Sequence, residues 1–144
     1  MPFACAARRY HVSISSILLV EDHKVFAKAL LRVLTANKDL DVVAVADTAE
    51  KALEQLHDLK VDLVLADISL PKMSGIALVE ELHARYPKLP CAVISGHVSP
   101  QYVRSALDAG ARGYMVKENP GGILEGIQRV LAGELYISKE VGKI

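Results

Sequence analysis

The sequence has no excess of charge of either sign and almost no cysteine. Lys plus Arg and Asp plus Glu both number 17 in the 144 residues, so net charge gives no reason to expect that this segment itself binds nucleic acid or a membrane surface. The two cysteines, Cys5 and Cys91, lie in very different contexts, one near the N-terminus and one in an apolar run. We therefore expect no disulfide, and this cysteine usage is typical of a reducing cytosol.

Long apolar runs and repeats are also missing. No stretch approaches the roughly 18 consecutive apolar residues of a membrane-spanning helix, and Arg8 and Arg9 are not followed by an apolar segment long enough for export. The absence of a repeat or a low-complexity linker, together with 144 residues and 51% hydrophobic content, favours a single folded domain. We expect that domain at residues 15–135 of a cytoplasmic protein, and we treat residues 1–14 as an unassigned extension.

What the sequence does contain is five alternations of strand-like and helix-like segments. Continuous apolar runs predict buried strands, and apolar residues at intervals of three and four predict the helices between them. Alternation of this kind predicts an α/β fold, in which helices cover both faces of a parallel sheet. No partner within the chain can be named for residues 135–144. The predicted strands are 16–20, 42–46, 61–66, 92–95 and 113–116, and the predicted helices are 24–36, one opening at Thr48, 76–86, one from Ser99-Pro100 to Gly110, and one from Asn119-Pro120 to Gly133.

Four of the predicted strands end on polar residues of different chemical kinds. Glu21 and Asp22 follow the first strand, Asp67 follows the third, Ser95 ends the fourth, and Lys117 follows the fifth. Ligands of parallel sheets bind outside the carboxyl ends of the strands. We therefore predict that three carboxylates, a hydroxyl and an ammonium group share one site.

Carboxylates crowded together either shift a pKa upward or recruit a cation, and here a cation is favoured. Oxygen ligands without a Cys or His cluster suit a hard ion that keeps part of its water shell, which points to Mg²⁺. We expect Asp22 and Asp67 as direct ligands, Glu21 as a ligand through water, and the backbone carbonyl of Ser69 on one side.

A site with Mg²⁺, an ammonium group and a hydroxyl matches a phosphoryl group, because the cations neutralise its oxygens and the hydroxyl donates a hydrogen bond. One carboxylate then serves as nucleophile. Asp67 is the candidate, since an aspartyl phosphate is a known type of covalent intermediate. Lys117 and Ser95 would contact the phosphoryl oxygens.

These residues lie in motifs that resemble the response-regulator receiver domain of two-component signalling, over about residues 15–135. The resemblance implies a flavodoxin-like (βα)5 receiver fold with a central five-stranded parallel sheet in the order 2-1-3-4-5. The motifs are Val20-Glu21-Asp22-His23, the run from Asp67 through Pro71 to Gly75, Ser95-Gly96, and Gly113-Tyr114-Met115-Val116-Lys117.

The resemblance also implies residue roles. Asp67 would accept a phosphoryl group from a sensor histidine kinase, Glu21 and Asp22 would be the acidic metal pair, and Lys117 would assist. Ser95 and Tyr114 would form a switch pair that changes the face built from the fourth helix, the fifth strand and the fifth helix. The domain would be no enzyme in the usual sense, but a phosphoacceptor that assists its own phosphorylation and dephosphorylation and forms a homodimer when phosphorylated.

The final third looks most like receivers of LuxR/NarL-type transcription regulators. The segments that carry this likeness are 98–103 and 109–114. The likeness implies transcription regulation by a DNA-binding output domain that is absent from these 144 residues. Residues 136–144 would begin the linker to it, and DNA would be bound only through that domain.

Rival interpretations differ in single residues. A phosphatase of the haloacid-dehalogenase type needs a second aspartate two residues after the nucleophile, where this chain has Ser69. A pseudo-receiver that is never phosphorylated usually loses the acidic pair or the lysine, and both are present here. A stand-alone receiver acting through protein contacts stays open. Taken alone, Glu21-Asp22 could cap a helix, and the scattered histidines read as surface residues.

Overall fold

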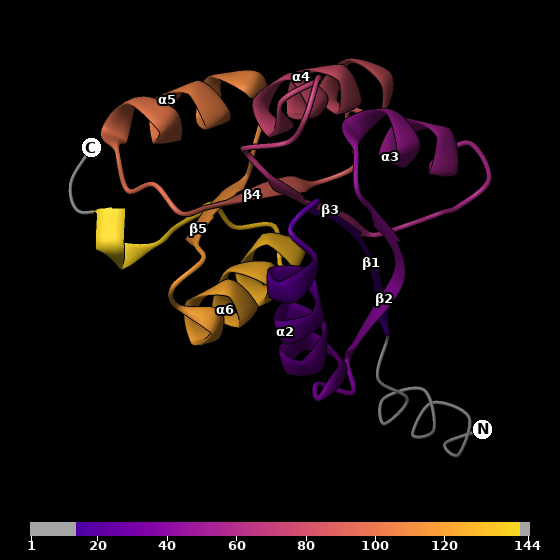
Figure 1. The fold of residues 1–144 in the computed structure, drawn as a ribbon, viewed down its shortest axis with the longest axis horizontal. Helices are drawn as coiled ribbons and strands as arrows, with labels where there is room; N and C mark the ends of the chain where they lie inside the picture. The colour runs from indigo at the N-terminus through magenta and orange to yellow at the C-terminus, as the bar shows by residue number, and fades with distance from the viewer. Residues whose placement is uncertain (1–13, 142–144) are drawn as a thin grey trace, which may run out of the picture.

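A six-stranded sheet lies at the centre of the computed structural model, which describes residues 14–141 (Figure 1). Every neighbouring pair of strands is parallel, and the order is β2-β1-β3-β4-β5-β6. The predicted order 2-1-3-4-5 is confirmed, and the sixth strand was not predicted. The strands are β1 (Ser15–Val20), β2 (Leu40–Ala46), β3 (Leu63–Asp67), β4 (Cys91–Ser95), β5 (Gly113–Val116) and β6 (Tyr136–Ile137).

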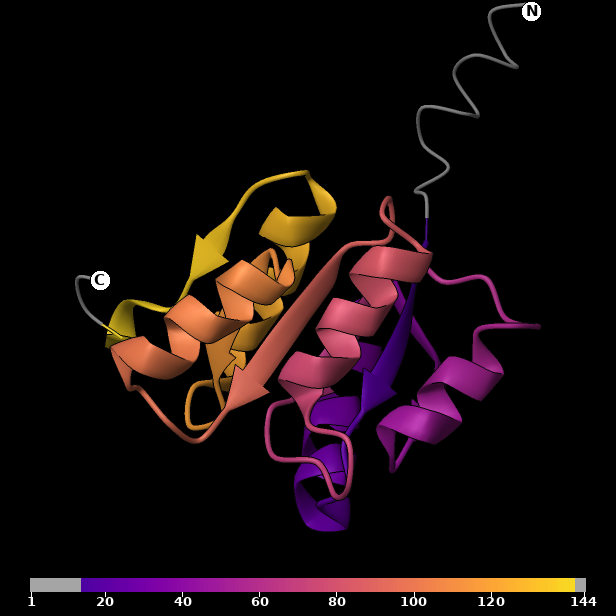
Figure 2. The same ribbon diagram turned by 90° about the horizontal axis from the view of Figure 1, so that it is seen from above.

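Helices cover both faces of this sheet, as predicted. Three of them, α3, α4 and α5, lie on one face, and α2 and α6 lie on the other (Figures 1 and 2). The helices are α2 (Lys24–Thr35), α3 (Ala49–Gln55), α4 (Gly75–Arg85), α5 (Pro100–Ala109) and α6 (Pro120–Leu131), followed after β6 by the 3₁₀ turn η1 (Lys139–Val141).

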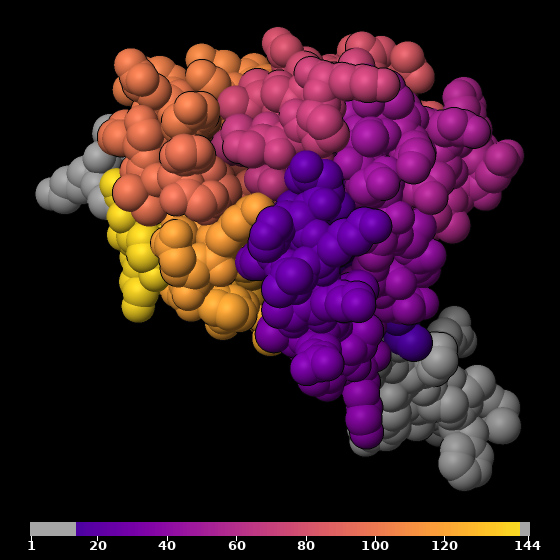
Figure 3. All heavy atoms as spheres, in the orientation of Figure 1, coloured from indigo at the N-terminus to yellow at the C-terminus, as the bar shows by residue number. Residues whose placement is uncertain are grey.

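The central strands are buried on both sides, which explains their continuous apolar runs. All residues of β3, β4 and β5 are buried. Two apolar clusters result, one on each face. Leu78, Val103 and Tyr114 belong to the cluster under α4 and α5, whereas Leu30 and Ile127 belong to the cluster under α2 and α6. Figure 3 shows the surfaces of α2 and α6 lying side by side, and both helices contribute residues to the second cluster.

Side-chain caps fix the starts of the helices at the carboxyl end of the sheet. Thr48, Ser99 and Asn119, where three of the predicted helices begin, cap α3, α5 and α6. The cap of α2 is His23, whose Nδ1 accepts a hydrogen bond of 3.3 Å from the Phe26 N–H. The alternative that Glu21-Asp22 caps this helix is therefore wrong, and both acids remain available to a site.

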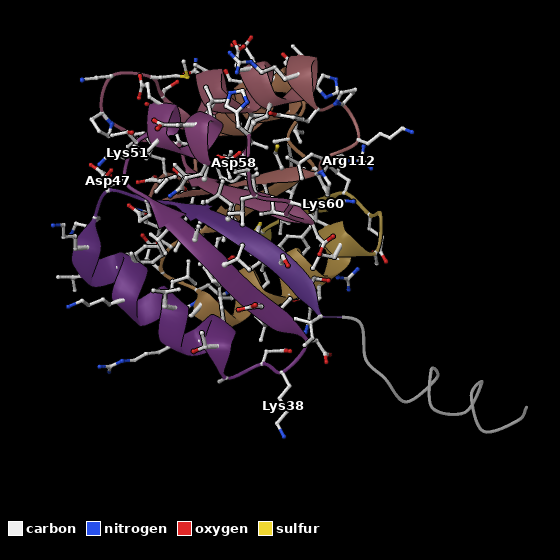
Figure 4. The ribbon with its side chains drawn as sticks, turned by 90° about the vertical axis from the view of Figure 1, so that its right-hand side faces the viewer. Lys38, Asp47, Lys51, Asp58, Lys60 and Arg112 are labelled. Atoms are coloured by element: carbon white, nitrogen blue, oxygen red, sulfur yellow. The ribbon has the colours of Figure 1, made fainter. Side chains whose placement is uncertain are left out.

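Asp47 also takes part in holding α3, though not as its cap. Its carboxylate lies 3.0 Å from the Lys51 ammonium, at the end of the edge strand β2, where Figure 4 labels both residues. This exposed pair lies one turn apart in the sequence, and such pairs contribute little to stability.

The C-terminal segment 136–141 packs against β5. The Tyr136 N–H donates to the Arg112 carbonyl at 3.0 Å, and the Ser138 N–H donates to the Tyr114 carbonyl at 2.9 Å. Ser138 and Val141 are buried. The part of the chain for which the sequence named no partner is thus attached to the sheet up to residue 141.

Among residues 14–141, no helix has the length and apolar character needed to cross a membrane. Cys91 is a buried free thiol in β4, and burial raises its pKa to about 12, as fits a small core residue. Cys5 and the rest of residues 1–13 lie outside the described residues.

Candidate functional site

The polar residues predicted to share a site lie at one edge of the sheet. Glu21 directly follows β1, Asp67 and Ser95 end β3 and β4, and Lys117 directly follows β5. All these strands are parallel, so their carboxyl ends point the same way. The fold thus brings residues that are far apart in the sequence to one rim.

The Lys117 ammonium lies between two carboxylates. Its Nζ is 3.1 Å from Asp67 Oδ2 and 3.1 Å from Glu21 Oε1. Burial alone would lower the pKa of Lys117, but the contacts with Asp67 and Glu21 outweigh it and raise that pKa. Lys117 therefore carries its charge at neutral pH.

Three carboxylates gather beside this ammonium. Glu21, Asp22 and Asp67 each offer an oxygen, and these oxygens lie within 4.8 Å of one another. Glu21 and Asp67 are only 2% and 3% exposed, whereas Asp22 is open to solvent. The cluster has the spacing and the hard oxygen donors that a divalent cation needs.

Glu21 shows the electrostatic strain of this crowding. Burial and the negative charge of Asp67 raise its pKa from 4.5 to about 7, against the opposing effects of the His23 N–H and Lys117. The His23 N–H donates to Oε2 at 3.0 Å, but Oε1 accepts no hydrogen bond from the described residues, although the Lys117 ammonium is near. A buried carboxylate oxygen without a hydrogen-bond donor fits a site for Mg²⁺, and the bound ion would favour the ionised form of Glu21.

Asp67 is held at both oxygens. Oδ1 accepts a hydrogen bond of 3.1 Å from the Ser69 N–H, and Oδ2 accepts the one from Lys117. The backbone of Asp67 is also in close contact with the start of α4, since a Cβ at Gly75 would lie 2.0 Å from the Asp67 carbonyl oxygen. Only glycine fits there. The role of the Ser69 carbonyl as a metal ligand stays a prediction.

Lys117 has a further neighbour in Phe26, an apolar residue of α2. Its ammonium lies 4.7 Å from the centre of the Phe26 ring, which is a cation–π contact. The Lys117 N–H also donates to the Ser95 carbonyl at 2.9 Å. No feature of the sequence distinguishes Phe26 from the other apolar residues of the predicted helix 24–36.

Ser95 and Tyr114 meet through the loop between β4 and α5. Ser95 is 1% exposed, and its Oγ accepts a hydrogen bond of 2.9 Å from the His97 N–H. Tyr114 is fully buried, and its hydroxyl donates to the His97 carbonyl at 2.8 Å. Burial raises the pKa of Tyr114. The backbone of His97, which sequence reasoning had treated as a surface histidine, thus links the serine to the tyrosine.

Comparisons with known proteins agree with the fold and the site. A family model described as the response regulator receiver domain matches residues 17–128. The chain is 32% identical over 126 residues to the transcriptional regulatory protein DegU of Brevibacillus brevis, covering 87% of this chain and 53% of the relative. It is 38% identical over 124 residues to the transcriptional activator protein ExaE of Pseudomonas putida, covering 85% of this chain and 58% of the relative. The chain thus spans a little more than half the length of these curated relatives.

Solved structures give the same result. A LuxR family two-component response regulator from an Aurantimonas species superposes with a TM-score of 0.86 at 26% identity, covering 90% of this chain and 93% of that chain. The receiver domain of the putative response regulator NarL from Mycobacterium tuberculosis superposes with a TM-score of 0.80 at 25% identity, covering 85% of this chain and 99% of that chain. These similarities confirm the predicted flavodoxin-like fold and the predicted likeness to LuxR/NarL-type receivers.

Proposed function

Because this chain belongs to the response regulator receiver domain family, we propose that it accepts a phosphoryl group on Asp67 and changes its surface in response. The observation that carries the proposal is the Lys117 ammonium, 3.1 Å from both Asp67 and Glu21. A cation held at the carboxylate that would react is what a phosphoryl group requires of its site.

The transfer is a displacement at phosphorus. A carboxylate oxygen of Asp67 forms a bond to phosphorus while the bond from phosphorus to the donor breaks, and the leaving group takes the electron pair. The donor would be a phosphohistidine of a sensor histidine kinase or a small acyl phosphate. Lys117 would bind the phosphoryl oxygens, and the Ser95 hydroxyl would donate to one of them.

Mg²⁺ is the cofactor that these residues fit. We propose that Asp22, Asp67, Glu21 and the backbone carbonyl of Ser69 hold it. When bound, the ion would neutralise negative charge on the phosphoryl oxygens and on the crowded carboxylates. The protein itself supplies the alignment, since Asp67 is fixed by the Ser69 N–H and by Lys117.

The response would pass from Ser95 and Tyr114 to the face formed by α5, β5 and α6. The helices α5 and α6 are the fourth and fifth helices predicted from the sequence. We propose that this face controls homodimer formation and a DNA-binding output domain of the LuxR type outside these 144 residues, since DegU and ExaE carry the names of transcriptional regulators. The domain would assist its own phosphorylation and dephosphorylation and act in the cytoplasm.

The rival functions fit the residues less well. Ser69 stands where a phosphatase of the haloacid-dehalogenase type needs its second aspartate, and its N–H is occupied with Asp67. A pseudo-receiver has no need for a lysine held between two buried carboxylates. A stand-alone receiver differs only in its output.

The test is phosphorylation by acetyl phosphate, read by intact mass with and without Mg²⁺. We expect one added phosphoryl group that requires Mg²⁺ and disappears in Asp67→Asn. Asp47→Asn is the matched control, because this aspartate also follows a strand but pairs only with Lys51. An unmodified wild-type chain, or equal modification of Asp67→Asn, would contradict the proposal.

A further inference from the structure

The C-terminal segment 136–141 is joined to β5 at two separate places. Along the strand edge, the Ser138 N–H donates to the Tyr114 carbonyl at 2.9 Å. Beyond the end of β5, the Asn119 side-chain amide donates to Glu140 Oε2 at 2.8 Å. Figures 1 and 2 show this segment, in yellow, running beside the end of α5 and of the sheet.

Glu140 closes these contacts into a ring. Its Oε1 accepts a hydrogen bond from the Ser138 hydroxyl, and its Oε2 accepts the one from Asn119. Both contacts favour the carboxylate and lower the pKa of Glu140. From Tyr114 the ring runs through Ser138, Glu140 and Asn119, and returns along the chain through Lys117.

Asn119 is a firm corner of this ring. Its Oδ1 caps α6 by accepting from the Gly122 N–H at 3.0 Å, while its N–H donates to the Val116 carbonyl at 3.1 Å. Asn119 therefore fixes the turn that carries Lys117, two residues earlier. A shift of this turn would therefore move the Asn119 amide that donates to Glu140.

Tyr114 is the other fixed point of this ring of contacts. Its side chain is connected to Ser95 through the backbone of His97. The Tyr114 hydroxyl donates to the His97 carbonyl, and the His97 N–H donates to Ser95 Oγ. A phosphoryl oxygen that accepts a hydrogen bond from the Ser95 hydroxyl would leave Ser95 both donating and accepting, which stabilises the loop that anchors Tyr114. Val141 packs in the same apolar cluster as Tyr114.

We propose that Glu140 is a positioning residue for the phosphorylation switch, holding Ser138 and Asn119 together so that segment 136–141 is coupled to Tyr114 and Lys117. This inference rests on the proposed function of Asp67. Coupling of this kind is reciprocal: a phosphoryl group at Asp67 tightens the binding of segment 136–141 to β5, and that segment in turn strengthens binding at Asp67.

Amide hydrogen exchange of the 144-residue chain, with Mg²⁺ alone and with Mg²⁺ plus beryllofluoride, tests the coupling. In the wild type we expect slower exchange both at residues 68–75, next to Asp67, and at residues 136–141. In Glu140→Ala the slowing at 68–75 persists and that at 136–141 is lost. The variant should also bind beryllofluoride about fivefold more weakly, the size expected for one hydrogen bond coupled to binding.

Glu134→Ala is the matched control. Glu134 precedes the same segment, is exposed, and pairs with Arg129 on α6. It should behave as the wild type in both measurements. Ser138→Ala, which removes only the hydroxyl contact with Glu140, is the second variant and should also lose the slowing at 136–141.

The outcomes separate the two proposals. Slowing at 68–75 without any change at 136–141 in the wild type would overturn the coupling and leave phosphorylation of Asp67 standing. Unchanged exchange at both segments would overturn the coupling together with the proposed function. Equal effects of Glu140→Ala and Glu134→Ala would also overturn it, because the contacts of Glu140 would then have no special part.

Discussion

Lys117 and Asp67, separated by 50 residues in the sequence, are joined by a hydrogen bond of 3.1 Å between Nζ and Oδ2. The same ammonium lies 3.1 Å from Glu21 Oε1, so one positive charge balances two buried carboxylates. This balance decides what substitutions and pH changes should do to the protein.

Lys117→Ala should lower both the free energy of unfolding and the rate of phosphorylation. Without the ammonium, Glu21 and Asp67 face each other with no cation between them, and we expect a loss of about 2 kcal/mol at pH 7. Urea denaturation measures the first effect and acetyl phosphate labelling the second. Lys51→Ala, which breaks an exposed pair, should leave the free energy of unfolding nearly unchanged. Equal losses in the two variants would show that Lys117 does not neutralise buried charge.

Asp67→Asn should stabilise the fold while abolishing phosphorylation. The amide oxygen can still accept from Lys117 or from the Ser69 N–H, but the repulsion of Glu21 is removed. We expect a gain of about 1 kcal/mol in the free energy of unfolding at pH 7. The gain should shrink near pH 5, where Glu21 is protonated in the wild type and the repulsion is already absent. A gain that is equal at both values would place its origin elsewhere.

The pKa of Glu21 sets two pH dependences. Folding raises this pKa from 4.5 to about 7, so the folded state binds more protons than the unfolded chain between these values. The free energy of unfolding should therefore fall as pH rises from about 4.5 to about 7 through this group. Mg²⁺ binding needs the ionised carboxylate and should strengthen over the same rise. Calorimetric titration of Mg²⁺ at pH 6 and pH 8 checks the second expectation, and Glu21→Gln should remove most of the difference.

Gly75→Ala should be among the most damaging single-methyl additions in the chain. Its Cβ would lie 2.0 Å from the Asp67 carbonyl oxygen, so backbone must move at the residue that we propose is phosphorylated. We expect a loss of at least about 3 kcal/mol in the free energy of unfolding, measured by thermal or urea denaturation. Gly96→Ala is the control, because nothing lies within 4 Å of the Cβ it would add. A stable Gly75→Ala variant would mean that the approach of α4 to β3 is looser than the structure shows.

The parts of the fold that could be predicted are those whose residues carry a local pattern. Buried parallel strands show as apolar runs, and Thr48, Ser99 and Asn119 were identifiable as caps because their side chains act within one helical turn. The ends of strands carry a weaker local pattern than their centres. The sequence placed the third strand at 61–66, whereas β3 is Leu63–Asp67, since an apolar residue such as Val61 can also be buried outside a strand.

Features that depend on backbone contacts left no trace in the sequence. The strand β6 has two residues, too few for an alternating pattern, and its pairing uses main-chain groups that every residue has. The cap of α2 by His23 rather than by an acid depends on the direction in which the chain leaves β1. The inward position of the Tyr114 ring and its bond to the His97 carbonyl likewise follow from tertiary packing.

The candidate site was more predictable than its supports. Parallel strands align their carboxyl ends, so the positions of Glu21, Asp67 and Lys117 followed from topology once the strands were recognised. Phe26, which contacts the Lys117 ammonium, could not be distinguished from other apolar residues of its helix. Which neighbours hold a charged group is decided by side-chain geometry rather than by sequence spacing.

The attachment of residues 136–141 to β5 has a practical meaning for biosensor engineering. A fluorescent reporter that replaces the chain after residue 135 would remove the contacts of Tyr114 with Ser138 and of Asn119 with Glu140. A reporter fused after Ile144 would keep these contacts. It would be attached to segment 136–141, which we propose is coupled to phosphorylation of Asp67. The choice between these two fusion points would separate a silent label from one that reads out the state of the domain.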